Sequence, residues 1–264
     1  MVDKPLLNVE GKPLRILVTN DDGIHAEGLV VLENIAKSLS PDVWVVAPED
    51  EQSGKSHSLT LADPIRLRRI DDRHVAVSGT PADCVIMAVR KIMPGMPDLV
   101  LSGVNRGQNV ADDVTYSGTI AAAMEGTSIG LKSFAVSQVY GYHQEGDMQW
   151  RVAMEHGPAL MRKLYTAELG PGVLVNINFP DCRPDEVRGV KVTRQGKRDQ
   201  NMLLVDERLD MRGNRYYWLG FRRENSKPAE GTDLYAVYNK WISVTPLHMN
   251  LTQLDAVDAL NAVV

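Results

Sequence analysis

The fold of this chain is decided by residues 15–23, which read RILVTNDDG. The apolar run Ile16–Val18 is typical of a strand buried on both faces. Two adjacent carboxylates, Asp21 and Asp22, follow that strand, and Gly23 permits a sharp turn behind them. Open α/β sheets bind ligands at the carboxyl ends of their strands, and neighbouring aspartates repel each other when ionised. We therefore expect a cation site at the end of this strand.

The composition limits the classes of protein to which the chain can belong. Its 264 residues are 44% hydrophobic, which is enough for one large domain with an appendage, and the net charge of −5 argues against nucleic-acid polymers as partners. Cys84 and Cys182 lie far apart with no zinc-ligand spacing, so we expect two buried thiols. No segment approaches the roughly 20 apolar residues of a membrane span, and no signal peptide is visible. We expect a cytoplasmic protein that binds no membrane.

Strand-like and helix-like patterns alternate through the first part of the chain. Strands separated by helices of this length pair in parallel through right-handed crossovers. We therefore predict an α/β fold, a Rossmann-like and mostly parallel sheet flanked by helices, with Val173–Asn178 as its closing strand. The other expected elements are strands at Val43–Ala47, Val75–Val77, Leu99–Leu101 and Phe134–Val136, and helices at Leu29–Leu39, Pro81–Met93, Thr119–Ile129 and Met148–Tyr165.

The pattern changes after residue 186. Longer and more polar strands, Val187–Gln195 and Leu234–Val244, favour antiparallel hairpins that project from the core. We therefore divide the chain into a catalytic core, residues 1–186, and a C-terminal hairpin and tail extension, residues 187–264, involved in oligomerisation. The aromatic run Tyr216–Trp218 fits a solvated cross-strand patch and an oligomer contact surface equally well. The tail is expected to form a short amphipathic helix.

Three strand ends carry oxygen-bearing side chains. The first delivers Asp21 and Asp22, the second the loop Glu49–Ser56, and the fourth the loop Ser102–Asn109. Parallel strands end at one edge of the sheet, so these loops can converge. Oxygen ligands without a histidine or cysteine cluster favour Mg²⁺ or Mn²⁺ over zinc. An aspartate pair can equally be an ordinary turn or helix cap, and its position at a strand end is what favours the metal site.

A possible anion site lies further along the chain. Ser117–Thr119 stands where an alanine-rich helix begins, and the free N–H groups of a helix start bind phosphate. Gly118 would allow an anion to approach closely. The alternative is an ordinary serine cap with no ligand.

Two nucleotide-handling motifs fail on inspection. A P-loop that ended in Gly54-Lys55-Ser56 would need glycine at position 49, which is Glu49. Phosphatases of the haloacid dehalogenase fold need a second aspartate two residues after the nucleophile, and neither Asp21 nor Asp22 has one.

Several motifs, in order along almost the whole chain, together resemble the SurE family of metal-dependent nucleotidases. They are NDDG at 20–23, SG at 53–54, SGTPADCV at 78–85, SGVNRGQN at 102–109, YSGTIAAAMEG at 116–126, GTD at 231–233 and SVTPL at 243–247.

The resemblance implies roles for individual residues. One divalent metal ion per subunit would be held by Asp21, Asp22, Ser53 and Asn105. The substrate phosphate would be bound by Asn109, Ser117, Gly118 and Thr119. Arg106 departs from the small residue usual in the family, and a long cation beside the phosphate could alter substrate preference.

The family implies hydrolysis of nucleoside monophosphates at the 5′ and in some cases the 3′ position, sometimes of polyphosphate, and assembly into homodimers or homotetramers. We expect attack by a metal-activated water, with Asp21 and Asp22 as the catalytic carboxylates. A nonenzymatic nucleotide- or phosphate-sensing module would hold the same phosphate without turnover. A purely structural oligomer would gain no thermal stability from metal.

Overall fold

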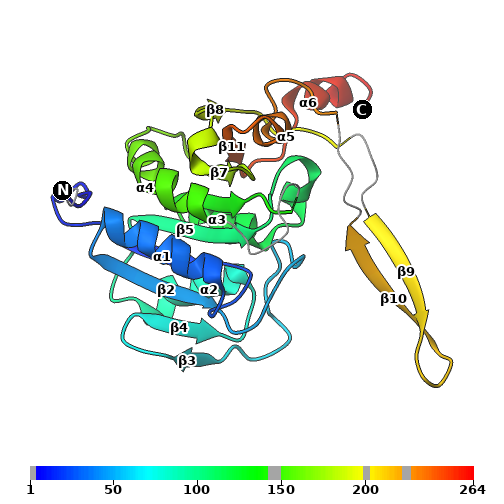
Figure 1. The fold of residues 1–264 in the computed structure, drawn as a ribbon, viewed down its shortest axis with the longest axis horizontal. Coiled ribbons are helices and arrows are strands. Elements are labelled where there is room, and N and C mark those ends of the chain that lie inside the picture. Colours follow the sequence, from blue (N-terminus) through cyan, green and yellow to red (C-terminus); the bar gives the residue numbers. More distant parts are fainter. Residues whose placement is uncertain (1–3, 142–149, 199–202, 222–226) are drawn as a thin grey trace.

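The structure is a computed structural model that describes residues 4–141, 150–198, 203–221 and 227–264 (Figure 1). Its helices are α1 (Glu27–Leu39), α2 (Pro81–Met87), α3 (Gly118–Ser128), α4 (Arg151–Tyr165), α5 (Asp233–Tyr238) and α6 (Leu254–Asn261), with short helical turns η1 (Ala88–Ile92), η2 (Ala111–Thr115) and η3 (Pro184–Glu186). Its strands are β1 (Arg15–Thr19), β2 (Asp42–Pro48), β3 (Leu67–Arg69), β4 (His74–Val77), β5 (Leu99–Arg106), β6 (Lys132–Gln138), β7 (Val173–Phe179), β8 (Val190–Val192), β9 (Leu203–Leu209), β10 (Arg215–Phe221) and β11 (Ile242–His248).

Nine strands form the main sheet in the order β3-β4-β2-β1-β5-β6-β7-β11-β8. Pairing is parallel from β4 through β7, whereas β3 and β11 run antiparallel to β4 and β7. The predicted mostly parallel α/β sheet is therefore confirmed. The chain builds outward from β1 to β2 on one side and from β1 to β5 on the other, and ligands of open sheets bind at such a reversal point.

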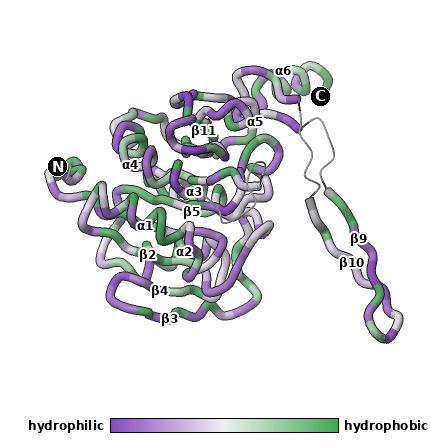
Figure 2. Tube along the Cα trace, viewed as in Figure 1, coloured by the Kyte–Doolittle hydropathy of each residue, from purple (hydrophilic) through white to green (hydrophobic). Residues whose placement is uncertain are grey.

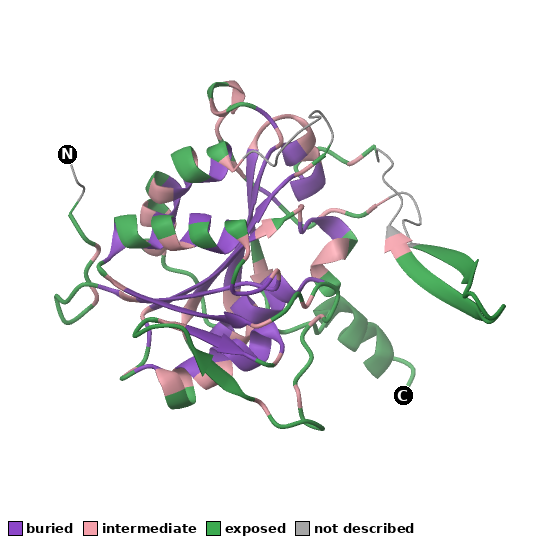
Figure 3. Cartoon of the chain, turned by 60° about the horizontal axis from the view of Figure 1, so that its bottom comes forward, coloured by how far each residue is buried: buried purple, intermediate pink, exposed green. Residues whose placement is uncertain are grey.

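Helices cover both faces of the sheet, which explains the continuous apolar run in β1. Ile16 and Val18 pack into the cluster that includes residues of α1 and α4. Leu17, which points to the other face, packs with residues of α2. Figure 3 shows the strands buried between helical layers that are exposed on their outer sides.

Some predicted boundaries differ from the structure. Strand β5 does not end at Leu101 but continues to Arg106, with an irregular register between Ser102 and Asn105. The predicted helix over Pro81–Met93 is α2 followed directly by the π-helical turn η1. The predicted start of α4 at Met148 lies outside the described residues, and the helix runs from Arg151.

The predicted strand over Leu234–Val244 is wrong. Its first part is helix α5, because Thr232 caps that helix by accepting a hydrogen bond from the Tyr235 N–H at 3.3 Å. Leu234 and Val237, three residues apart, then bury one helical face. The sheet also does not close at β7, since β11 pairs with β7 and β8 pairs with β11. Two strands of the segment 187–264 thus belong to the main sheet.

The predicted antiparallel hairpin is present as β9 and β10, which form a separate two-stranded sheet away from the main body (Figure 1). Figure 2 shows apolar and polar residues mixed along it, in contrast to the apolar central strands. The tail forms the predicted helix, α6. Both cysteines are buried free thiols, as expected. Within the described ranges, no helix is both long and apolar enough to cross a membrane.

Candidate functional site

The turn after β1 is closed by its own asparagine. The Asn20 side chain donates to the Gly23 carbonyl at 2.9 Å and accepts from the Gly23 N–H at 3.2 Å, and Gly23 has a φ of +102°. The Gln52 N–H donates to the Asp21 carbonyl at 2.7 Å. The loops after β1 and β2 therefore lie side by side, as the parallel topology requires.

Asp21 lies against the start of α3. Its side chain is 4% exposed, and the Thr119 hydroxyl donates to its Oδ1 at 2.6 Å. A Cβ on Gly118 would stand 2.8 Å from the Asp21 Cβ, so only glycine allows this approach. Burial raises the pKa of Asp21 to about 6, Thr119 opposes that rise, and the charge of Asp22 adds to it.

Asp22 lies between β1 and the end of β5. Its Oδ2 accepts from the Arg106 N–H at 3.3 Å. Burial raises the pKa of Asp22, the Arg106 N–H opposes the rise, and repulsion from Glu51 adds to it. Both aspartates thus carry negative charge that the surrounding protein compensates poorly. A bound cation would provide that compensation.

The other two predicted metal ligands, Ser53 and Asn105, each bond a residue two positions away in the chain. The Ser53 hydroxyl donates to Glu51 Oε1 at 2.9 Å, in an exposed loop, rather than to either aspartate. The Asn105 amide nitrogen donates to the Gly107 carbonyl at 2.9 Å, so its amide oxygen is the atom available as a ligand. Two carboxylates, a hydroxyl and an amide oxygen form a donor set that fits Mg²⁺ or Mn²⁺. The described residues hold no cluster of three or more His, Cys, Asp or Glu side chains suited to a metal.

The predicted phosphate residues at the start of α3 also serve the helix itself. Ser117 is the N-cap, because its hydroxyl accepts from the Ile120 N–H at 3.1 Å. The alternative interpretation of this serine as a cap is therefore correct for its side chain. The cap uses only that oxygen, and the positive end of the helix still points toward the site.

Asn109 connects the phosphate residues to the metal residues. Its backbone N–H donates to Asn178 Oδ1 at 2.8 Å, and its carbonyl accepts from the amide of the same Asn178 at 3.1 Å. Its own side chain donates to Ser137 at 2.9 Å and to the Thr119 hydroxyl at 3.4 Å. Since Thr119 donates in turn to Asp21, one hydrogen-bonded chain runs from Asn109 to the carboxylate pair.

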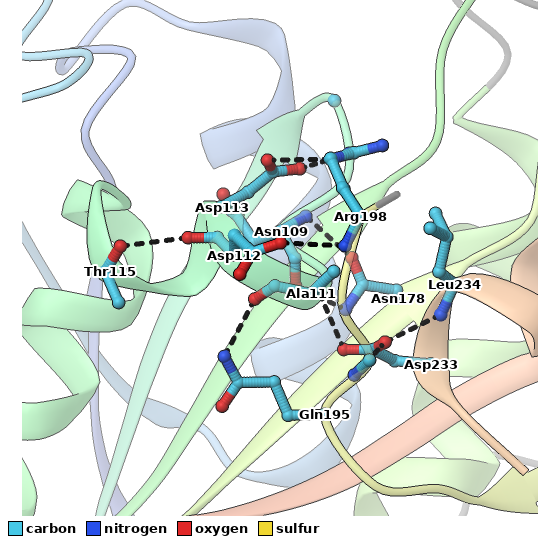
Figure 4. A network of polar contacts seen from close by, with 12 residues as sticks. Asn109, Ala111, Asp112, Asp113, Thr115, Asn178, Gln195, Arg198, Asp233 and Leu234 are labelled. Carbon is cyan, nitrogen blue, oxygen red and sulfur yellow. Dashed lines mark hydrogen bonds and ion pairs between the residues drawn. The ribbon is translucent and has the colours of Figure 1, made fainter. Parts of the chain in front are cut away.

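The sequence did not reveal the residues that bond the segment around Asn109 and Ala111, which follows β5 (Figure 4). Two buried asparagines of β7, Asn176 and Asn178, bond the backbone of Asn109, and polar residues alternating within an apolar strand were the signal for them. Gln195, Arg198 and Asp233 approach the same loop from the C-terminal part of the chain. Among Gln195, Arg198 and Asp233, only Asp233 belongs to one of the motifs that resemble the SurE family.

Comparison with known proteins gives consistent results. The sequence model of the family described as "Survival protein SurE" matches residues 16–202. The 5′-nucleotidase SurE of Parvibaculum lavamentivorans is 60% identical over 251 residues, which cover 95% of this chain and 91% of that protein. The 5′-nucleotidase SurE of Methylobacterium nodulans is 59% identical over 90% of this chain and 95% of its own. The crystal structure of the SurE protein from Aquifex aeolicus superimposes with a TM-score of 0.81 at 38% identity, and covers 94% of this chain and 98% of its own.

Proposed function

The chain belongs to the SurE family, and on that premise we propose that it is a divalent-metal-dependent 5′-nucleotidase, which hydrolyses nucleoside monophosphates to nucleoside and phosphate. The observation that carries the proposal is the hydrogen bond from Thr119 to the buried Asp21. It joins a helix start suited to a phosphate with a carboxylate pair suited to a cation, in one continuous site.

Asp21, Asp22, Ser53 and Asn105 would together hold one Mg²⁺ or Mn²⁺ ion per subunit. When bound there, such an ion supplies Lewis-acid chemistry that makes water a competent nucleophile near neutral pH. Asp21 and Asp22 orient the attacking water and receive its proton as a coupled pair. Thr119 keeps the Asp21 carboxylate in one orientation through the 2.6 Å hydrogen bond.

The phosphate side of the site stabilises the charge that develops during the reaction. Residues Ser117–Thr119 form the N-terminus of α3, and Asn109 lies beside them. The first N–H groups of this helix have no partner within the helix. Donors and a helix dipole aimed at the phosphoryl oxygens bind the substrate and lower the barrier to attack. Because α3 is packed against the sheet, these donors are in place before the substrate arrives.

Phosphate release from a panel of 5′- and 3′-nucleotides and polyphosphate, with Mn²⁺, Mg²⁺ or a chelator, tests this function. We expect turnover of 5′-monophosphates that the chelator abolishes, with slower turnover of 3′-nucleotides and polyphosphate. Nucleotide binding without any turnover would instead support the nonenzymatic sensing module. Failure of the metal to raise thermal stability would support the structural oligomer.

We further propose that the segment 187–264 mediates assembly into a homodimer or homotetramer in the cytoplasm. In the hairpin, Tyr217 and Trp218 are 55% and 58% exposed, and in the tail Leu254 and Leu260 are also exposed. Exposed apolar side chains of this size are typical of contacts with another chain. Light scattering of the wild type and of Trp218→Glu tests the proposal, since disruption of such a contact should lower the mass.

A further inference from the structure

The buried carboxylate of Asp233 reaches from the C-terminal part of the chain into the loop that follows β5 (Figure 4). Asp233 has no exposed surface, and its Oδ1 accepts from the N–H groups of Gly196 at 2.8 Å and Leu234 at 2.7 Å. Its Oδ2 accepts from the N–H of Ala111 at 2.9 Å, across 122 positions of sequence. One oxygen therefore serves its own segment, and the other serves the distant loop.

Ala111 needs these outside contacts. Its backbone φ is +53°, in the left-handed region that residues other than glycine rarely adopt, and the residue is completely buried. Asp233 holds its N–H, and the Gln195 side chain donates to its carbonyl at 2.9 Å. Both backbone polar groups of this unfavourable conformation are thus satisfied by side chains from the C-terminal segment.

A second contact holds the same loop a few residues later. Arg198, whose side chain is 7% exposed, forms an ion pair with both carboxylate oxygens of Asp113, and its Nε lies 3.0 Å from Oδ1. Its backbone N–H donates to Asp112 at 2.8 Å. The loop between Asn109 and the cap of α3 is therefore fixed from the C-terminal side at two places.

We propose that Asp233 is a positioning residue for the phosphate site, an inference that rests on the proposed function. Through the Ala111 N–H it fixes the backbone two residues after Asn109, and through that backbone it fixes the amide that bonds Thr119. Asp233 itself touches no substrate, because it is buried behind the loop. The C-terminal GTD segment thereby sets the geometry of a site formed by the first half of the chain.

Asp233→Asn tests this role by replacing one carboxylate oxygen with an NH2 group. The amide oxygen can still accept from Gly196 and Leu234, but the amide nitrogen then faces the Ala111 N–H, so that bond is lost. We expect the KM for a 5′-nucleotide and the inhibition constant of inorganic phosphate each to rise about tenfold, as for loss of one hydrogen bond to a charged group. We expect kcat and Mn²⁺ affinity to change little, because the bond supports phosphate binding in ground and transition states alike.

Asp98→Asn is the matched control. Asp98 accepts the Arg15 N–H at 2.7 Å at the opposite end of β1, so this variant should lower the melting temperature without raising KM. Gln195→Met removes the donor to the Ala111 carbonyl from an exposed position, and provides a second variant should Asp233→Asn not fold. We expect Gln195→Met to raise KM about threefold, as for loss of a neutral hydrogen bond.

The rate of amide hydrogen exchange in residues 109–117 measures how firmly the loop is held, and this measurement does not depend on enzyme activity. We expect faster exchange there in Asp233→Asn and Gln195→Met than in Asp98→Asn. The inference is overturned if KM, phosphate inhibition and this exchange all match the control. A wild type that releases no phosphate from any nucleotide would refute the proposed function instead, and the exchange comparison would still decide whether Asp233 holds the loop.

Discussion

The two halves of the candidate site differ sharply in how they are held. On the phosphate side, Asp21, Asn109 and Thr119 are buried and joined by hydrogen bonds that cross from one element to another. On the other side, Ser53 is exposed, and its hydroxyl donates to Glu51, two residues away. The buried half is fixed by folding of the chain, whereas the exposed half has little to order it except a ligand.

The difference follows from where each half lies in the fold. The phosphate half is formed by β1, β5 and the start of α3, with β7 behind it, and its side chains Asp21, Asn109 and Thr119 are buried. The loop after β2 runs over the surface, where Gly54 and Ser56 both have positive φ. A loop of this kind can adapt to a metal ion without disturbing the core. Substitutions in the two halves should therefore have effects of very different size.

Asp21→Asn should have the largest effect. The change preserves shape and removes the charge that both a cation and the reaction require, so we expect phosphate release to fall at least about a thousandfold. The melting temperature of the metal-free protein should not fall, because a neutral amide is easier to bury. Asp63→Asn, on the exposed loop after β2, is the control and should be fully active. Turnover within tenfold of the wild type would remove Asp21 from the catalytic centre.

The second largest effect concerns stability and pH. The pKa of Asp21 is raised from 3.8 to about 6, so between these values the folded protein binds more protons than the unfolded chain. Its stability contribution is therefore complete below about pH 4 and is lost as pH rises through 6. We expect the free energy of unfolding of the chelated protein to fall by up to about 3 kcal/mol from this group between pH 4 and pH 7.

Urea unfolding with chelator at several pH values, for the wild type and Asp21→Asn, measures this contribution. The variant should lack it, and Mn²⁺ at pH 7 should restore stability only to the wild type. If the two pH profiles ran parallel, burial of Asp21 would not be the source of the shift.

Thr119→Val should have an intermediate effect, because it cuts the link between the start of α3 and the carboxylate pair while keeping the shape of the side chain. The Asp21 carboxylate would lose its 2.6 Å donor, and we expect kcat/KM to fall about thirtyfold. Thr127→Val, at the other end of α3, is the matched control, since its hydroxyl donates to the helix carbonyl of Ala123. Equal losses in the two variants would mean that the helix, rather than the contact to Asp21, had been damaged.

Features of the site encoded in short stretches of sequence could be predicted. The apolar run before Asp21 specified the central strand, and serine-glycine-threonine before an alanine run specified the start of α3. The parallel topology then required the loops after β1, β2 and β5 to share one edge. Each of these inferences needs only local periodicity and one rule of sheet connection.

The parts that could not be predicted depend on contacts between distant residues. Leu234–Val244 is rich in β-branched and aromatic residues and was predicted as a strand, but the Thr232 cap begins a helix there. The partner of Asp233 is Ala111, and nothing near either residue indicates the other. Asn178 stands out as a polar residue in an apolar strand, but the sequence does not indicate that it bonds the backbone of Asn109. Such contacts become visible only when the topology is known.

Ser53→Ala should have the smallest effect and is the sharpest test of the comparison. The serine is exposed, and its hydroxyl bonds Glu51 at 2.9 Å, so its removal leaves no buried group unsatisfied and should not change the melting temperature of the metal-free protein. As one neutral ligand among four, it should weaken Mn²⁺ binding about fivefold, with kcat at saturating metal nearly unchanged. Ser128→Ala, an exposed serine at the far end of α3, should leave Mn²⁺ affinity unaltered. Calorimetric titration of both variants distinguishes the outcomes. If Ser53→Ala lowered kcat/KM as much as Thr119→Val, the exposed half would be as tightly specified as the buried one.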